Sequence, residues 1–174
     1  MRISLHQHVV FLAILAFLSA CSSPRKATTA PKSLPDGMYL VLNEYMTVPA
    51  GTEKGVIVPF NHDFLLEPDS EDPRFLAVDP ADFVALQLAS APEQSEQPNQ
   101  RVNLLLSLNS MAKDQLAAFT AKNLNKPVAI VIGGQAVTKH KVKSVIDGGK
   151  LQISWCTKFA CEKLLVELQD NVGQ

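Results

Sequence analysis

The stretch Phe119–Gln135 (FTAKNLNKPVAIVIGGQ) decides the class of fold, because it contains the end of one element and the start of two others. Its first part is helical in composition, and Pro127 must end that helix because proline lacks a backbone donor and clashes with the preceding turn. The residues that follow, Val128–Ile132, form an apolar, largely β-branched run that predicts a buried strand. Gly133–Gly134 is a two-residue hairpin signal, so a second strand is expected over Gln135–Lys139.

The sequence on both sides of this stretch predicts further elements of the same two kinds. Ser110 is expected to cap the preceding helix, whose apolar face would carry Met111, Leu116, Phe119, Thr120 and Leu124. A final helix is expected over about Lys158–Asp170, with one face formed by Phe159, Leu164, Leu165 and Leu168. Strands are expected at Met38–Met46, Val56–Phe60, Phe64–Glu67, Phe75–Val78, Phe83–Ala89, Val102–Leu108 and Leu151–Trp155.

This order of strands, helix, strands and helix predicts an α+β fold. We expect a mixed or antiparallel sheet with two main helices packed on one side. The polar stretch Ala91–Gln100 (APEQSEQPNQ) contains two prolines and is expected to be an exposed loop inside one domain.

Two segments of the second half resemble a known family. Phe119–Gln135 resembles the pattern F-T-x-x-N-[IL]-G-K-x-[LM]-A-I-V-[LI]-D-G-x, and Gly148–Ser154 (GGKLQIS) resembles G-G-[RK]-x-Q-I-[ST]-G. Both patterns belong to the head subdomain of the first periplasmic domain of SecD and SecDF, accessory subunits of the Sec translocon. The departures are Asn125 for a glycine, Gly133 for an aspartate and Trp155 for a glycine. The resemblance implies the head fold and a role in contacting exported polypeptides.

The N-terminus has the pattern of a secretory signal. Arg2 precedes the apolar run Val9–Leu18, which is too short to cross a bilayer, since a spanning helix needs about 20 apolar residues. Leu18–Cys21 (LSAC) resembles the lipobox of bacterial lipoproteins, in which the cysteine thiol receives diacylglycerol and the bond before it is cut. The alternative is an ordinary signal peptide cleaved at Ala20, with Cys21 incidental.

The predicted organisation therefore has three parts. Residues 1–20 are a signal peptide, residues 21–36 are the lipidated Cys21 and a flexible tether, and residues 37–174 are a SecD-head-like α+β domain. No later stretch is apolar enough to span a membrane, so the acyl chains (palmitate among them) are the expected anchor. Ser22 is not the aspartate that retains many lipoproteins at the inner membrane, so we expect the outer membrane, facing the periplasm.

Basic residues are concentrated in the second half of the chain, around Lys139-His140-Lys141-Val142-Lys143. In a strand over Gln135–Val145, side chains alternate with period two, so the three lysines would share one face. They are candidates for binding an acidic partner or lipid headgroups. The alternative is a solvated strand edge that lysines protect from aggregation.

Cys156 and Cys161 would both lie in the periplasm, where disulfides persist. Their spacing, between the end of a strand and the start of a helix, allows a small disulfide ring; free buried thiols are the alternative. No nearby histidine or further cysteine completes a tetrahedral metal site with them.

We find no catalytic set in the sequence. His62 and Asp63 are adjacent, so in an extended segment they point to opposite faces and do not form a dyad. We therefore expect no enzymatic activity, no metal or other cofactor and no nucleic-acid partner. The predicted function is a membrane-anchored periplasmic lipoprotein that binds exported polypeptide or an envelope protein; the alternative is a solute-binding or structural envelope lipoprotein that shares only the fold.

Overall fold

The computed structural model describes residues 34–51, 54–65, 67–97 and 101–173, which lie in one compact unit. The signal peptide, Cys21 and all but the last three residues of the predicted tether lie outside the described residues. Within the described part of the chain, no helix is long and apolar enough to cross a lipid bilayer.

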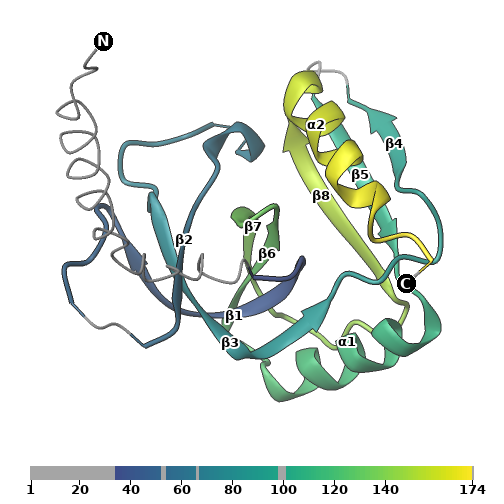
Figure 1. Cartoon of the computed structure of the whole chain (residues 1–174), viewed down its shortest axis with the longest axis horizontal. Coiled ribbons are helices and arrows are strands. Elements are labelled where there is room, and N and C mark those ends of the chain that lie inside the picture. Colours follow the sequence, from purple (N-terminus) through teal and green to yellow (C-terminus); the bar gives the residue numbers. More distant parts are fainter. Residues whose placement is uncertain (1–33, 52–53, 66, 98–100, 174) are drawn as a thin grey trace, which may run out of the picture. The chain divides into compact units, whose positions relative to one another are not determined.

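A five-stranded antiparallel sheet forms one half of the domain (Figure 1). Its strand order is β2-β3-β1-β6-β7, so β7 lies at one edge. The strands are β1 (Gly37–Tyr45), β2 (Val56–Pro59), β3 (Phe75–Ala85), β6 (Pro127–Ile132) and β7 (Gln135–Lys141).

A three-stranded antiparallel sheet and two helices form the other half. The strand order is β4-β5-β8, so β8 lies at one edge of this sheet. The elements are β4 (Glu93–Glu96), β5 (Val102–Ser107), α1 (Ser110–Lys122), β8 (Lys150–Cys156) and α2 (Lys158–Gln169). The predicted α+β class with antiparallel strands and two helices is confirmed, although the strands form two sheets.

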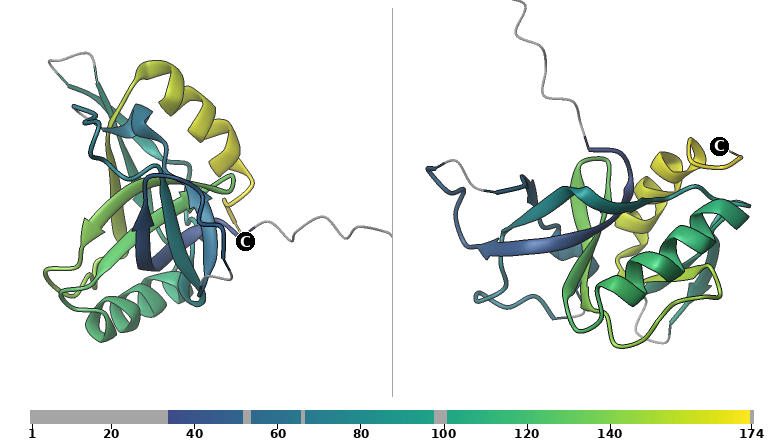
Figure 2. Two further views of the ribbon diagram at one scale, coloured as in Figure 1. Left: turned by 90° about the vertical axis from the view of Figure 1, so that its left-hand side faces the viewer. Right: turned by 90° about the horizontal axis from the view of Figure 1, so that it is seen from below.

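The main core cluster lies between the two sheets and includes residues of both helices, which are on the same side of the five-stranded sheet (Figure 2). It includes Leu104 of β5, Leu116 of α1 and Leu164 of α2. A second core cluster, with Tyr39 and Leu76, lies on the opposite face of the five-stranded sheet. Alternate residues of β6 enter the two clusters, which explains why Val128–Ile132 is apolar without interruption.

The hairpin between β6 and β7 is the turn that the two glycines predict. Gly133 and Gly134 have φ of 56° and 76°, and a two-residue turn of this kind needs positive φ at both positions. A bulge after this turn shifts the register between Ile130 and Val131. Ala136 and Val137 enter different core clusters, as neighbouring residues of a strand between two clusters do.

Both helices begin at capping side chains, but their buried faces differ from the predicted ones. Asn109, and not Ser110, caps α1: its Oδ1 accepts a hydrogen bond from the Ala112 backbone N at 2.9 Å. The buried residues of α1 are Ala112, Leu116, Phe119 and Thr120, whereas Met111 and Leu124 are exposed. In α2 the buried residues are Ala160, Cys161, Leu164 and Leu168, and Phe159 is 78% exposed.

Three strand predictions need correction. Phe64–Glu67 is not a strand: a short 3-10 helix, η1 (His62–Phe64), ends there, and the Asn61 side chain accepts from the Asp63 backbone N. Asp79 and Pro80 do not separate two strands, because β3 passes through them as a bulged strand. The predicted loop Ala91–Gln100 contains β4, which pairs with β5 although all its side chains are exposed.

Candidate functional site

Strands β7 and β8, each at an edge of its own sheet, lie close to each other, and we call the region between them the seam. At one end the seam is closed by the segment Phe60–Phe64, which contacts both strands and lies between the two sheets (Figure 1). Asn61 donates its backbone N–H to the Ala136 carbonyl oxygen of β7 at 2.9 Å. Thr157, directly after β8, donates its backbone N–H to the Asp63 carbonyl oxygen at 3.4 Å.

At its other end the seam opens into a pocket of about 250 Å³, which we call the seam pocket. Its floor consists of buried side chains of the main core cluster: Met38, Val128, Ile130, Val142 and Leu151. Its rim is cationic, with Lys141 from β7, Lys143 from the following loop and Lys150 from β8, and His140 of β7 lies beside them. The described residues that line it include no aspartate or glutamate. An apolar floor with a cationic rim suits a ligand that combines apolar and acidic groups.

The three lysines predicted as partner-binding residues occupy different places. Strand β7 ends at Lys141, so the predicted strand to Val145 is too long and Lys143 does not share the strand face. Lys139 does not line the pocket, because its Nζ lies 2.8 Å from Glu44 Oε2 of β1. Lys141 and Lys143 line the pocket, and within the described residues neither forms an ion pair with a carboxylate.

Two pocket residues were missed as candidates from the sequence. Lys150 comes from β8, which belongs to the other sheet and lies beside β7 only because the two sheets pack together, so no local pattern reveals it. Alternation along a strand places His140 on the face opposite Lys139 and Lys141, and it lines the core-facing pocket. Although much of its side chain is exposed, partial burial of the ring lowers the pKa of His140 below its usual value of 6.5.

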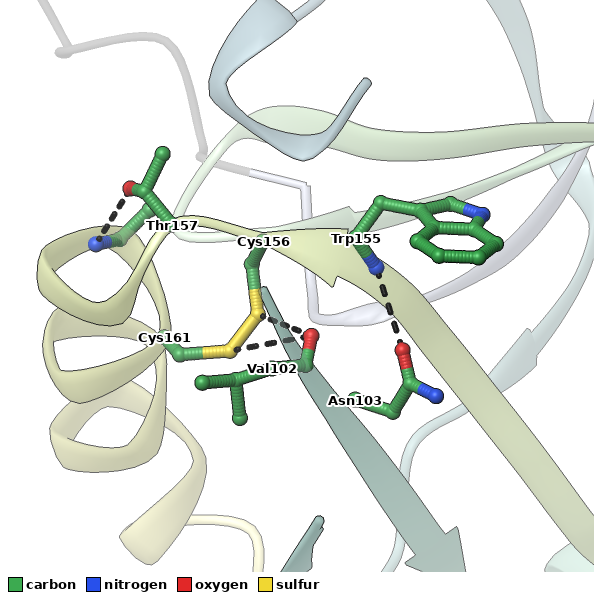
Figure 3. The surroundings of a disulfide bond; sticks show 7 residues. Val102, Asn103, Trp155, Cys156, Thr157 and Cys161 are labelled. Atoms are coloured by element: carbon green, nitrogen blue, oxygen red, sulfur yellow. Dashed lines mark hydrogen bonds between the residues drawn. A yellow bond between two sulfur atoms is a disulfide. The ribbon is translucent and has the colours of Figure 1, made fainter. Parts of the chain in front are cut away.

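Cys156 and Cys161 fix the far end of β8 to the start of α2, where the structure joins them by a disulfide bond (Figure 3). Their Cα atoms are 5.6 Å apart, within the range that a disulfide spans. Both side chains are buried, and their Sγ atoms lie 3.2 Å and 3.9 Å from the Val102 carbonyl oxygen. Both cysteines are therefore part of the core, and neither lines the seam pocket.

Metal ligands are not gathered anywhere in the part of the chain that the structure describes: no three histidine, cysteine, aspartate or glutamate side chains form a group that could hold an ion. The seam pocket offers apolar contact, positive charge and the backbone groups of two strand edges.

The model of the SecDF P1 head subdomain family matches residues 66–169, which include α1, α2 and most strands. The chain belongs to this family. The family match confirms the SecD-head fold that the sequence resemblance implied. The matched region begins within the loop between β2 and β3 and ends at the last residue of α2. It therefore includes most of the residues that line the seam pocket.

Two solved structures of SecDF are similar to this chain. One, described as a membrane component that enhances protein export, shares 16% identity with a TM-score of 0.49, covering 77% of this chain and 62% of that chain. The other, SecDF in a super-membrane-facing form, shares 17% identity with a TM-score of 0.45, covering 76% of this chain and 18% of that chain. This chain thus spans less than two thirds of either SecDF chain. No curated protein matches it in sequence.

Proposed function

We propose that this SecDF-head protein is a lipid-anchored periplasmic module that binds segments of polypeptide in the cell envelope during protein export. The observation that carries the proposal is the seam pocket, whose apolar floor and cationic rim lie between two unpaired strand edges. The family supports the link to export, since SecDF is described as a membrane component that enhances it. The proposal assigns the protein no enzymatic activity.

Polypeptide fits the seam pocket better than a small solute does. At about 250 Å³ the pocket is smaller than the roughly 300–1,000 Å³ of typical small-molecule sites. Strand edges add backbone donors and acceptors, which bind extended chains with little demand on their sequence. The second candidate function, a solute-binding or structural envelope lipoprotein, would require a ligand that fits the pocket without using these edges.

The test is site-specific photo-crosslinking in live cells. A photo-reactive amino acid at Ser144, which lines the pocket, should crosslink to newly exported polypeptides identified by pulse labelling. The matched control carries the same amino acid at Glu162, an exposed position on α2. Equal labelling at both positions, or none at Ser144, would contradict the proposal.

The lipid anchor has its own test. Replacing Cys21→Ala should abolish incorporation of a fatty-acid analogue, because only that thiol can take the diacylglyceryl group. Label retained by this variant would contradict lipidation at Cys21. Membrane fractionation of the wild-type protein should find it in the outer membrane, and inner-membrane residence would contradict that part of the proposal.

A further inference from the structure

The closed end of the seam shows how this protein fills the space between its two sheets. Phe60 forms a parallel bridge with Ala136 of β7, and the backbone of the next residues bonds both to β7 and to the residue after β8. At this end the extended residues Phe60 and Asn61 pair with β7, and Asp63 of η1 bonds to the residue after β8, so the backbone of this segment connects the ends of the two strands. The side chain of Phe60 is buried in the second core cluster as part of this arrangement.

The open end has the same two edges without such a segment. On β7 the pocket is lined by Thr138, His140 and Lys141, and on β8 by Lys150, Leu151 and Gln152. In the described part of the chain, β7 pairs only with β6 along these residues, and β8 pairs only with β5. Both edges thus present backbone groups to the pocket.

We propose that an extended segment of a client polypeptide inserts between β7 and β8 at the seam pocket and pairs through its main chain with these edges. The segment would combine apolar side chains, directed to the pocket floor, with acidic side chains directed to the lysine rim. This inference rests on the proposed function, because it specifies how and to what chemistry the same site binds.

Alternation along β7 fits this combination of side chains. His140 lies opposite Val128, which belongs to the main core cluster, whereas Lys141 lies opposite Pro127 on the other face of the strand. Side chains of an inserted strand would alternate in the same way: one side chain would point to the core and the next would point to the lysines. Thr138, His140 and Lys141 of β7 line the pocket, so the lined part of the strand runs from Thr138 to Lys141. A client strand beside it, at roughly 3.3 Å per residue, would have about four residues enclosed.

Charge favours an acidic client over a basic one. Lys141, Lys143 and Lys150 are exposed, lack ion-pair partners among the described residues, and have His140 beside them. An acidic segment would reduce the mutual repulsion of these cations, whereas a basic segment would increase it. A bilayer of anionic lipid offers the negative charge but no extended backbone, so it is the competing occupant that the experiment must separate.

The experiment measures binding of synthetic peptides to the full mature protein by titration calorimetry. The probe is an eight-residue peptide of alternating valine and glutamate with blocked ends, and its control replaces every glutamate with lysine. Two further peptides carry N-methyl groups on the valines or on the glutamates. Alternate N–H groups of a strand point to opposite edges, so each methylated peptide lacks the donors of one edge.

We expect the valine–glutamate peptide to bind, and the lysine peptide to bind at least about tenfold more weakly. Methylation of at least one edge should weaken binding about tenfold or more, because it removes main-chain hydrogen bonds. The variant Lys141→Glu with Lys150→Glu should lose binding. Its control, Lys158→Glu with Lys163→Glu, makes the same charge change on exposed positions of α2 and should keep binding.

The outcomes separate this inference from the proposed function. Binding that ignores both methylations would overturn strand insertion and leave polypeptide binding in place. If neither the valine–glutamate peptide nor the lysine peptide binds, the inference is overturned. Crosslinking at Ser144 tests the proposed function independently of this result. Binding of phosphatidylglycerol vesicles that depends on Lys141 and Lys150, without peptide binding, would assign the rim to lipid and also overturn it.

Discussion

The two ends of the seam differ although the same two strands border both. At the closed end, Asn61 and Asp63 bond to the backbone of β7 and of the residue after β8, and Phe60 packs into the second core cluster. At the open end, the pocket has a floor of buried apolar side chains and a rim that contains Lys141, Lys143 and Lys150. The comparison teaches that the edge of β7 can pair with an added segment of backbone, and we propose that the open end of the seam is left for recognition.

Removing a buried side chain from the segment that closes the seam should have the largest effect on stability. Phe60 is 6% exposed and lies in the second core cluster, so Phe60→Ala should lower the free energy of unfolding by about 3–5 kcal/mol. Denaturant unfolding measures this loss. The control is Lys143→Ala at the open end, which should stay within about 0.5 kcal/mol of wild type. A Phe60→Ala loss below about 1 kcal/mol would erase the difference between the two ends.

The disulfide beside the closed end should contribute less. Replacing both cysteines (Cys156→Ala with Cys161→Ala) should cost about 2 kcal/mol, because the bond closes only a short ring and so restricts the unfolded chain little. Mass spectrometry of the periplasmic protein without reductant should show the loss of two hydrogens relative to the reduced chain. Two thiols that alkylate after unfolding without reductant would contradict the disulfide.

The ion pair of Lys139 should matter least for stability and not at all for the pocket. Lys139 and Glu44 are both partly exposed, and pairs of this kind contribute at most about 1 kcal/mol. Lys139→Ala should therefore change unfolding only slightly and leave binding of the valine–glutamate peptide as in wild type. Lys141→Ala, two residues away on the same strand, should weaken that binding. Equal weakening of binding by both variants would contradict this prediction, because it would make Lys139 part of the binding rim.

His140 predicts a small pH dependence of stability at the open end. Its pKa is below the usual 6.5 in the folded protein because burial disfavours the charged ring. The unfolded chain therefore binds the proton more readily, so this contribution to stability is present above about pH 6.5 and is lost as the pH falls through the folded pKa. Unfolding curves between about pH 7.5 and 5 should show a shallower fall for His140→Gln. An unchanged slope would contradict this role.

Local signals in the sequence predicted much of the fold. The apolar run of β6 and the hairpin glycines depend on neighbouring residues, and both are where they were expected. Helix α1, however, ends at Lys122 with Asn123 as its C-cap, before Pro127 is reached, and Pro127 is the first residue of β6. Strand β4 was missed because its four exposed polar residues have no hydrophobic pattern, and only pairing with β5 makes it a strand. Phe64 is apolar and buried, yet it belongs to the 3-10 helix η1, so apolar character alone misled the strand prediction.

The candidate site was predictable only in part. The lysine-rich arm of β7 is visible in the sequence, and two of its three lysines line the seam pocket. Their pocket also needs Met38 from β1 and Lys150 from β8, which belong to different sheets and come together only because the two sheets pack. Lys139 was included because spacing alone cannot show that Glu44, far away in sequence, pairs with it.

Hydrogen exchange of the peptide-saturated protein tests the central claim most directly. If a client segment pairs with both edges at the open end, backbone amides within Thr138–Lys141 and Lys150–Gln152 should exchange more slowly when the valine–glutamate peptide is bound. Amides around Asn61 and Ala136 should not change, because that end of the seam is already paired. Saturated binding with no added protection in either β7 or β8, or with protection only elsewhere, would contradict the account.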